Sequence, residues 1–133
     1  MAEWVETSVN VGPTVFYGEI RGHRTWADVP ADHGGHDAAP MPPETLLTAL
    51  GNCMGMVIAL SCKAHGVPYE GMRLDVAAEV VDKENRLDNF RLTIHMPGEL
   101  DEHGRKVVEA AQKLCKVGNT LMHGVKLEMT IAE

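Results

Sequence analysis

The period of the apolar residues changes along the chain, and this change separates strand-forming from helix-forming segments. Near the N-terminus, short mixed apolar and polar runs are separated by the turn signals Gly12-Pro13 and Arg21-Gly22. We therefore predict three strands, over residues 4–11, 14–20 and 23–28. The 15 residues that follow, rich in Gly, Pro, His and Asp, predict the one long loop of the chain. Loops of this length are often functional.

The most apolar part of the sequence predicts a long helix over residues 43–66. Pro43 is tolerated in a first turn, and Glu44 lies where a carboxylate stabilises the positive end of the helix dipole. Gly66 suits the left-handed conformation that ends many helices. After this helix we predict two paired strands, over residues 72–81 and 89–96.

A second helix is predicted over residues 99–119, with Gly118 at its end. Five apolar side chains share one of its faces at helical spacing: Val107, Val108, Ala111, Leu114 and Cys115. Residues 119–124 predict a short turn or helix, and the alternating segment 125–131 predicts a closing strand. This order is typical of an α+β fold with helices packed on a mostly antiparallel sheet, in a single domain over residues 1–133.

The charge balance narrows the classes of partner. Lys and Arg number 12 and Asp and Glu number 19, so the formal net charge is −7, which argues against nucleic acid and anionic lipid as partners. The N-terminal residues lack the basic start and apolar core of a signal peptide. Gly51, Asn52 and Gly55 interrupt the apolar helix, so we expect a core helix without a membrane span, in a cytoplasmic protein.

Three cysteines are too few and too scattered for a disulfide framework, and their spacing matches no zinc template. Cys53 and Cys115 lie on the two predicted helices, and their thiols approach each other if these helices pack side by side. In such a pair, one thiolate attacks a peroxide oxygen and becomes a sulfenic acid, which condenses with the second thiol to a disulfide. The alternative is that each cysteine is a small apolar filler, and for Cys62 this is our expectation.

A reactive cysteine needs a nearby cation or hydrogen-bond donors, because an unperturbed thiol has a pKa of about 8.5. An arginine oriented by a carboxylate suits this role. The candidates are Arg21 and Arg24, of which we prefer Arg24, together with Glu44. Glu44 and Cys53 are nine residues apart, on opposite faces of a straight helix. Glu44 therefore either reaches a shared arginine through a bend at Gly51 or is a helix-start residue only.

The long loop contains His33 and His36 between two aspartates, and histidine with carboxylate is a possible metal-binding combination. The spacing of three has meaning on a helix, whereas this segment is predicted to be a loop. We therefore expect neither a metal nor another cofactor, and interpret the segment as a solvated loop that closes over the site. The charged run 82–88 is interpreted as a solvated hairpin turn.

Two motifs are similar to those of a known family. The first, GGHDAAPMPPETLLTALGNC, resembles the OsmC/Ohr superfamily, whose members carry a Gly-Gly loop, Pro-x-Glu-Leu-Leu, and Ala-Leu-Gly before a cysteine. The second, EAAQKLCKVGNTLMHGVKLEM, resembles the second-helix cysteine, the small-residue turn and the last strand of that family. The chain departs from the pattern at Lys116, because the usual motif there is Cys-Pro. The spacing of Glu44 and Cys53 resembles the general OsmC-like branch.

The resemblance implies an intertwined homodimer, with mostly antiparallel sheets around two central helices and active sites near the interface. It also implies thiol-dependent reduction of organic hydroperoxides with electrons from a small dithiol and no metal or flavin. Cys53 matches the cysteine that attacks the peroxide, and Cys115 matches the resolving cysteine. Two other functions stay open: a redox sensor whose thiols oxidise without efficient turnover, and a protein that binds a small apolar ligand.

Overall fold

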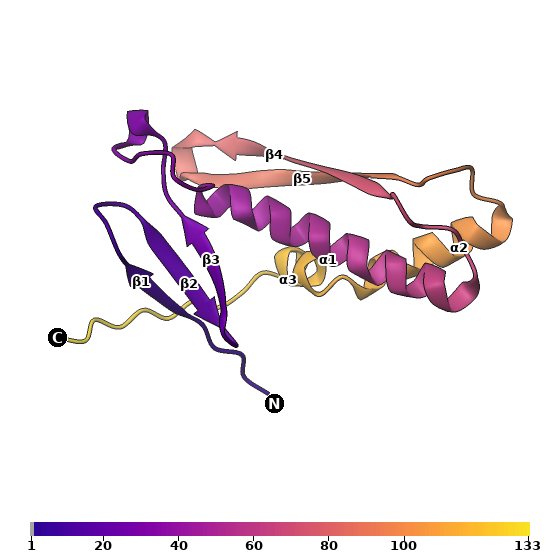
Figure 1. The fold of residues 1–133 in the computed structure, drawn as a ribbon, viewed down its shortest axis with the longest axis horizontal. Coiled ribbons are helices and arrows are strands. Elements are labelled where there is room, and N and C mark those ends of the chain that lie inside the picture. The colour runs from indigo at the N-terminus through magenta and orange to yellow at the C-terminus, as the bar shows by residue number, and fades with distance from the viewer. Residues whose placement is uncertain (1) are drawn as a thin grey trace. The chain divides into compact units, whose positions relative to one another are not determined.

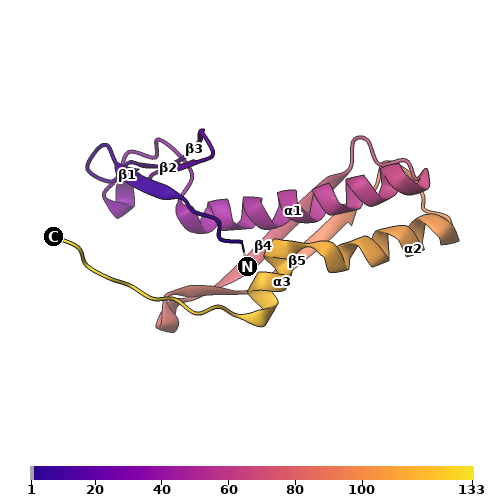
Figure 2. The same ribbon diagram turned by 90° about the horizontal axis from the view of Figure 1, so that it is seen from below.

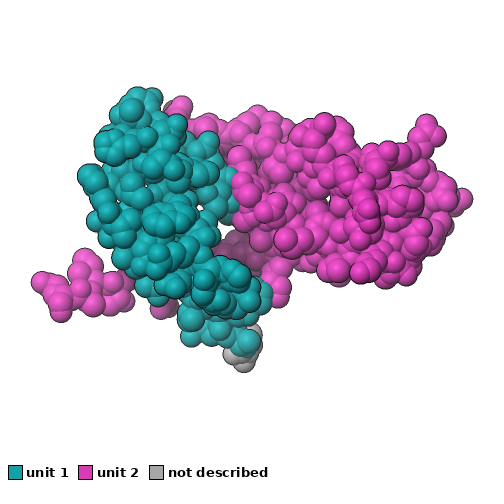
Figure 3. Space-filling model, in the orientation of Figure 1, with its two compact units in different colours: residues 1–46 teal, residues 47–133 magenta. Residues whose placement is uncertain are grey.

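The computed structural model describes residues 2–133, and the chain forms two compact units, divided between residues 46 and 47 (Figure 3). The strands and helices in chain order are β1 (Thr7–Asn10), β2 (Phe16–Ile20), β3 (His23–Ala27), α1 (Pro42–His65), β4 (Arg73–Val81), β5 (Arg86–His95), α2 (Glu102–Ala111) and α3 (Lys116–His123) (Figure 1). Three short 3-10 turns lie between them: η1 (Ala31–His33), η2 (Asp82–Glu84) and η3 (Gln112–Leu114). The predicted α+β class, with antiparallel sheets, is confirmed.

The first unit contains an antiparallel sheet of three strands in the order β1-β2-β3. Arg21 and Gly22 connect β2 to β3 and both have positive φ, 51° and 82°, as a tight two-residue hairpin turn requires. Tyr17 of β2 lies opposite Trp26 of β3, with ring centroids 5.4 Å apart. The three predicted strands are thus present, although β1 begins at Thr7 instead of residue 4.

Both ends of α1 are fixed by contacts that its own sequence supplies. At the start, the Glu44 carboxylate accepts a hydrogen bond of 2.9 Å from the Met41 backbone N–H. At the end, Gly66 has a φ of 70°, and the Val67 N–H donates to the Cys62 carbonyl at 2.9 Å. This is the left-handed helix end that glycine permits, so the predicted helix boundaries are confirmed to within one residue.

The second unit is built on the β4–β5 hairpin, with α1 and α2 alongside it (Figures 1 and 2). Gly51 and Gly55 of α1 lie against β4: a Cβ at Gly51 would be 3.0 Å from Val76, and one at Gly55 would be 3.3 Å from Leu74. Helix and strand therefore approach closely where two residues without side chains lie one turn apart. The core beyond this contact consists of Ile58, Cys62, Val67, Val108 and Ala111.

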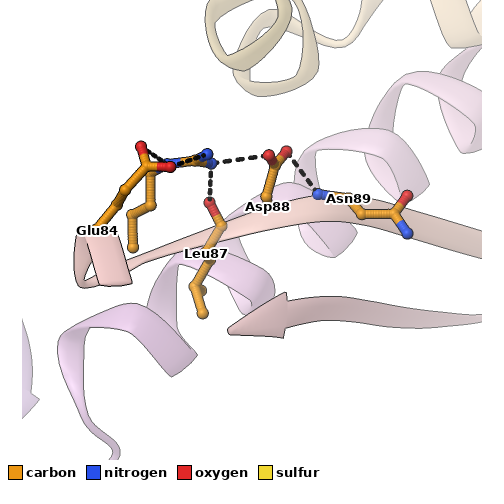
Figure 4. A network of polar contacts seen from close by, with 5 residues as sticks. Glu84, Leu87, Asp88 and Asn89 are labelled. Carbon is orange, nitrogen blue, oxygen red and sulfur yellow. Dashed lines mark hydrogen bonds and ion pairs between the residues drawn. The ribbon is translucent and has the colours of Figure 1, made fainter. Parts of the chain in front are cut away.

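The turn between β4 and β5 is charged and solvated, as predicted. Asn85 adopts the left-handed conformation with a φ of 51°. The Arg86 guanidinium donates to Glu84 at 3.0 Å and to Asp88 at 2.8 Å, with all three side chains largely in solvent (Figure 4). These hydrogen bonds hold the pKa values of the Glu84 and Asp88 carboxyls below their usual range.

The predicted second helix is wrong in one respect, because the chain leaves the helix at Cys115. Helix α2 ends at Ala111, η3 follows, and Cys115 is extended with φ −74° and ψ 103° before α3 begins. Gly118 lies inside α3 instead of ending a helix, and Leu114 is 62% exposed although it was placed on the buried face. The physical cause is a cap: the Cys115 sulfur accepts a hydrogen bond from the Gly118 N–H at 3.3 Å.

The predicted closing strand is also absent, since residues 124–133 form no strand in the described chain. The four apolar residues of the alternation are among the most exposed: Val125, Leu127, Met129 and Ile131. Alternation makes a segment suitable for one face of a sheet, but a strand forms only where a neighbouring edge supplies backbone hydrogen bonds. In the part of the chain that the structure describes, neither sheet includes this segment.

Candidate functional site

The structure brings the two predicted reactive cysteines together. Cys53 lies on α1, Cys115 lies between η3 and α3, and the two thiols are close enough for each to shift the pKa of the other. Cys115 is 1% exposed, whereas Cys53 is half-buried, and both thiols are free. The condition that the sequence left open, a close approach of the two thiols, is therefore met within the second unit.

The first residues of α3 also lower the pKa of Cys53. Burial acts to raise the pKa of Cys53, but hydrogen bonds from the Val117 N–H, the Cys115 thiol and the Lys116 N–H outweigh it. The positive charge of Lys116 acts in the same direction, so the pKa of Cys53 lies below its usual value. This thiol therefore has a larger thiolate fraction near neutral pH than an ordinary cysteine.

The pKa of Cys115 moves in the opposite direction. Burial raises the pKa of Cys115, and the hydrogen bond and charge interaction with the neighbouring Cys53 sulfur raise it further. The Gly118 N–H opposes this rise without reversing it. Of the two thiols, Cys53 is therefore the one that ionises more readily, and Cys115 is the one that stays protonated to higher pH.

Cys62 takes no part in this pair. Its side chain is 0% exposed, within the core of the second unit, and burial raises the pKa of its thiol. The prediction that Cys62 is an apolar filler is confirmed.

Glu44 and Arg24 belong to the first unit. Glu44 bonds the Met41 N–H, which is the helix-start role that the sequence offered as one alternative. The guanidinium of Arg24 lies 4.3 Å from the centroid of the Tyr17 ring, in a cation–π contact on the three-stranded sheet. That these two residues activate Cys53 stays a prediction.

Asp28, which directly follows β3, was not singled out from the sequence. Its side chain is 1% exposed and accepts hydrogen bonds from the Thr14 hydroxyl at 2.6 Å, the Ala38 N–H at 3.0 Å and the His36 N–H at 3.1 Å. These bonds, led by that of Thr14, hold the pKa of Asp28 well below its usual range. The sequence feature that could have identified Asp28 is its position directly after a predicted strand and before the Gly-Gly loop.

The long loop is therefore tied to the sheet of the first unit through its backbone. Gly35 is enclosed so closely that a Cβ there would overlap the Val29 carbonyl oxygen and approach the Asp28 carboxylate. His33 lies at the surface, 3.9 Å from the exposed Asp32 carboxylate. Among residues 2–133, no three His, Cys, Asp or Glu side chains lie together as a metal site would need.

A groove of about 690 Å³ follows the contact between α1 and β4 in the second unit. It exists because Gly51 and Gly55 contribute no side chains to its floor. Apolar residues make up most of the rest of its wall: Leu47, Met56, Ala59, Met72, Leu74 and Val76. Its size and composition suit a small apolar molecule or an apolar side-chain cluster.

Comparison with known families identifies the class of protein that this fold and dithiol define. The family of OsmC-like proteins matches residues 34–130, which includes both cysteine motifs. The chain belongs to this family. No curated protein matches the chain.

Solved structures agree with the family and show the same fold. A Psychrobacter arcticus protein named for osmotic stress induction and a detoxification response has a TM-score of 0.77 at 19% identity, over 90% of this chain and 88% of its own. An OsmC-like protein from Mycoplasma pneumoniae has a TM-score of 0.71 at 18% identity, over 91% and 88%. The organic hydroperoxide resistance protein OhrB of Bacillus subtilis has a TM-score of 0.59 at 12% identity, over 87% and 89%.

Proposed function

We propose that the protein is a thiol-dependent peroxidase that reduces organic hydroperoxides, with Cys53 as the attacking thiolate and Cys115 as the resolving thiol. The observation that carries the proposal is that the Cys53 and Cys115 thiols are neighbours in the second unit, where the pKa of Cys53 is lowered and that of Cys115 is raised. A peroxidase of this kind needs one thiolate and one nearby thiol. Family membership supports the proposal, as do structural neighbours named for organic hydroperoxide resistance.

The proposed cycle balances in atoms and electrons. The Cys53 thiolate attacks the terminal peroxide oxygen, the O–O bond breaks, and the alkoxide takes a proton and leaves as an alcohol. The Cys53 sulfenic acid condenses with the Cys115 thiol, which releases water and forms the Cys53–Cys115 disulfide. A small dithiol then supplies two electrons and two protons through thiol–disulfide exchange and leaves as its own disulfide.

In this proposal Arg24 is the cation near the Cys53 sulfur and Glu44 is the carboxylate that orients it, because a reactive thiolate needs such a pair. The three free cysteines suit a reducing compartment, so we place the protein in the cytoplasm.

We also propose that the protein is a homodimer with α1 at its centre. By length and composition α1 could cross a membrane, yet only 17% of its most apolar window is buried in the single chain. Met56 and Leu60, one turn apart, are 63% and 68% exposed, and the apolar residues of segment 125–131 are exposed to 74–91%. A second copy of the chain would cover both surfaces, which a monomer in water leaves uncovered. Gly51 and Gly55 favour this assignment over a lipid-facing helix, because their face of α1 is occupied by β4.

The test of the peroxidase begins with the reduced protein and one equivalent of tert-butyl hydroperoxide. We expect intact mass to fall by two hydrogens and peptide mapping to find a Cys53–Cys115 crosslink. Cys53→Ser should lose turnover with a small dithiol by at least about 10³-fold, since the nucleophile is removed. Cys115→Ser should stop at the Cys53 sulfenic acid.

Cys62→Ala is the matched control, since Cys62 lies outside the dithiol. It should keep its turnover per folded molecule. An unchanged mass, with all three thiols free after peroxide, would contradict the peroxidase. A crosslink without turnover would indicate the redox-sensor alternative.

The groove between α1 and β4 favours a second candidate function, the binding of a small apolar ligand. Such binding would not need the dithiol. It would therefore be saturable and would survive Cys53→Ser, whereas the peroxidase activity would not.

A further inference from the structure

Two histidines of the second unit lie close together where the end of α1 meets the start of α2 (Figures 1 and 2). His65 is the last residue of α1, and His103 is the second residue of α2. Both side chains are exposed, and the centroids of their rings are 6.3 Å apart. We propose that His65 and His103 together bind one exchangeable divalent ion of the class that imidazole suits, such as Ni²⁺, Cu²⁺ or Zn²⁺.

Hydrogen bonds to backbone carbonyls decide which ring nitrogen of each histidine is available to a metal. His65 Nδ1 lies 2.8 Å from the Ser61 carbonyl oxygen, and His103 Nε2 lies 3.1 Å from the His65 carbonyl oxygen. A carbonyl oxygen only accepts hydrogen bonds, so these two ring nitrogens carry the hydrogens. In the neutral rings, the lone pairs that a metal needs are therefore on His65 Nε2 and His103 Nδ1.

The same two hydrogen bonds are of the kind that supports metal-binding histidines. A ligating imidazole almost always donates its other ring N–H to a carbonyl, a carboxylate or water, which fixes the orientation of the ring. The His65 carbonyl is one of the last four of α1, which have no acceptor role within the helix, so the His103 N–H satisfies it. Both outer partners are thus in place on a single helix end.

The separation of the two rings suits one shared ion. Imidazole nitrogen binds Zn²⁺ at about 2.0–2.1 Å, which places the centroids of two rings on one tetrahedral ion about 5 Å apart. The observed separation of 6.3 Å exceeds this spacing by about 1 Å. Small rotations of two exposed side chains cover such a difference.

Water completes the coordination of the ion. Among residues 2–133, no third His, Cys, Asp or Glu side chain joins the pair to form a larger metal-binding group. A resident metal is held by three or four protein ligands, so two histidines suit an ion that exchanges with solvent. A hollow of about 180 Å³ beside His103 is also lined by Glu99 and Asp101, whose negative charges attract a cation.

Titration calorimetry of the full chain with NiCl₂ tests the site, because Ni²⁺ suits imidazole whereas thiolates select softer ions. We expect one ion per chain. His65→Gln and His103→Gln each remove an imidazole and keep an amide N–H for the carbonyl. Each should weaken Ni²⁺ binding at least about tenfold, since the loss of an outer partner alone has an effect of that size. The double variant should bind little more weakly than either single variant, because one imidazole forms no chelate.

His95→Gln is the matched control in the same unit. It removes an exposed imidazole that bonds the Asp75 carboxylate at 2.9 Å and makes no contact with the histidine pair in the described chain. Its affinity for Ni²⁺ should stay within about twofold of that of the unsubstituted protein, as expected for an independent position.

Thermal unfolding supplies a second readout. Ni²⁺ should raise the Tm of the unsubstituted protein, because an ion that joins α1 to α2 binds the folded chain only. This rise should be absent from His65→Gln and His103→Gln. Unfolding without metal shows whether each variant is folded, and if one is not, the other decides, because each removes half of the chelate.

Equal Ni²⁺ affinity in the unsubstituted protein and in the folded glutamine variants would overturn the site and leave the pair as a contact between two helix ends. Two ions that bind independently, one lost in each single variant, would also overturn it. Binding that is lost in Cys53→Ser and kept in His103→Gln would place the ion at the dithiol instead. Peroxide turnover has no part in these measurements, so the inference fails or stands separately from the proposed function.

Discussion

Asp28 joins three separate segments of the first unit through one carboxylate. It bonds the hydroxyl of Thr14 before β2 and two N–H groups of the long loop, at His36 and Ala38. The side chain is almost fully buried, and it stays ionised because three donors replace the water that it has lost. A single residue therefore sets the conformation of the loop that leads into α1.

The effect of Asp28 on stability depends on pH with a defined sign. Its folded-state pKa lies below the unfolded value of about 3.9, so its contribution is fully present above that pH and is lost as pH falls through the folded pKa. We expect Asp28→Asn to lower Tm by roughly 5 °C at pH 7, because an amide NH2 would face the backbone donors of the loop. Thermal unfolding from pH 7 to pH 2 should show this difference shrinking below pH 4.

The control for Asp28→Asn is Asp37→Asn, in the same loop. Asp37 is exposed and has a φ of 53°, which asparagine tolerates well. Equal melting temperatures for the two variants at pH 7 would contradict the anchoring role of Asp28.

At the scale of elements, α1 is defined by which of its faces are occupied. The side that carries Gly51 and Gly55 lies against β4, and Ile58 and Cys62 lie in the core with α2. Met56 and Leu60 remain outside both contacts. The small residues that made the helix seem interrupted in sequence are thus the ones that let it approach the strand.

Gly51→Val should destabilise the protein by about 1–3 kcal/mol, even though valine is a better helix former than glycine. The reason is overpacking, because the first added carbon would already lie 3.0 Å from Val76. Urea unfolding of this variant is best compared with Ala64→Val, which adds a branched side chain to an exposed site on the same helix. A Gly51→Val protein as stable as the unsubstituted one would mean that α1 does not approach β4 this closely.

At the scale of the whole molecule, the distribution of apolar surface is unusual for a single chain. Helix α1 exposes large apolar side chains, and the C-terminal segment places Val125, Leu127, Met129 and Ile131 in solvent at 74–91% exposure. Helix α1 has apolar residues at the spacing of a buried helix, and the C-terminal segment has them at the spacing of a buried strand. The proposed dimer accounts for both.

Leu60→Asp should weaken the dimer at least about tenfold, because a carboxylate buried against the apolar face of a second copy would lack a partner. Sedimentation velocity at several protein concentrations would show the dimer converting to single chains at higher concentration than for the unsubstituted protein. Asn85→Asp adds the same charge at the exposed β4–β5 turn and should leave association unchanged. Sedimentation of the unsubstituted protein as one chain at all concentrations would overturn the dimer.

The features that the sequence alone determined are those whose cause lies within a few residues. Glu44 and Gly66 fixed the ends of α1, Arg21-Gly22 fixed the turn after β2, and alternation fixed the β4–β5 hairpin. The choice of Cys53 and Cys115 came from the family motifs, and the structure added that their thiols meet.

Tertiary structure decided the features whose partners are distant along the chain. The sequence did not reveal that the helix is interrupted at Cys115. Apolar residues continue at helical spacing up to Cys115, although this residue caps the next helix. The groups that donate hydrogen bonds to Asp28 lie at positions 14, 36 and 38. The groups that lower the pKa of Cys53 lie at positions 115–117. Segment 125–131 has the alternating pattern of a strand, but a strand also needs a neighbouring strand to accept and donate its backbone hydrogen bonds. The physical reason is common to all four features: a hydrogen bond needs two groups, and sequence periodicity describes only one of them.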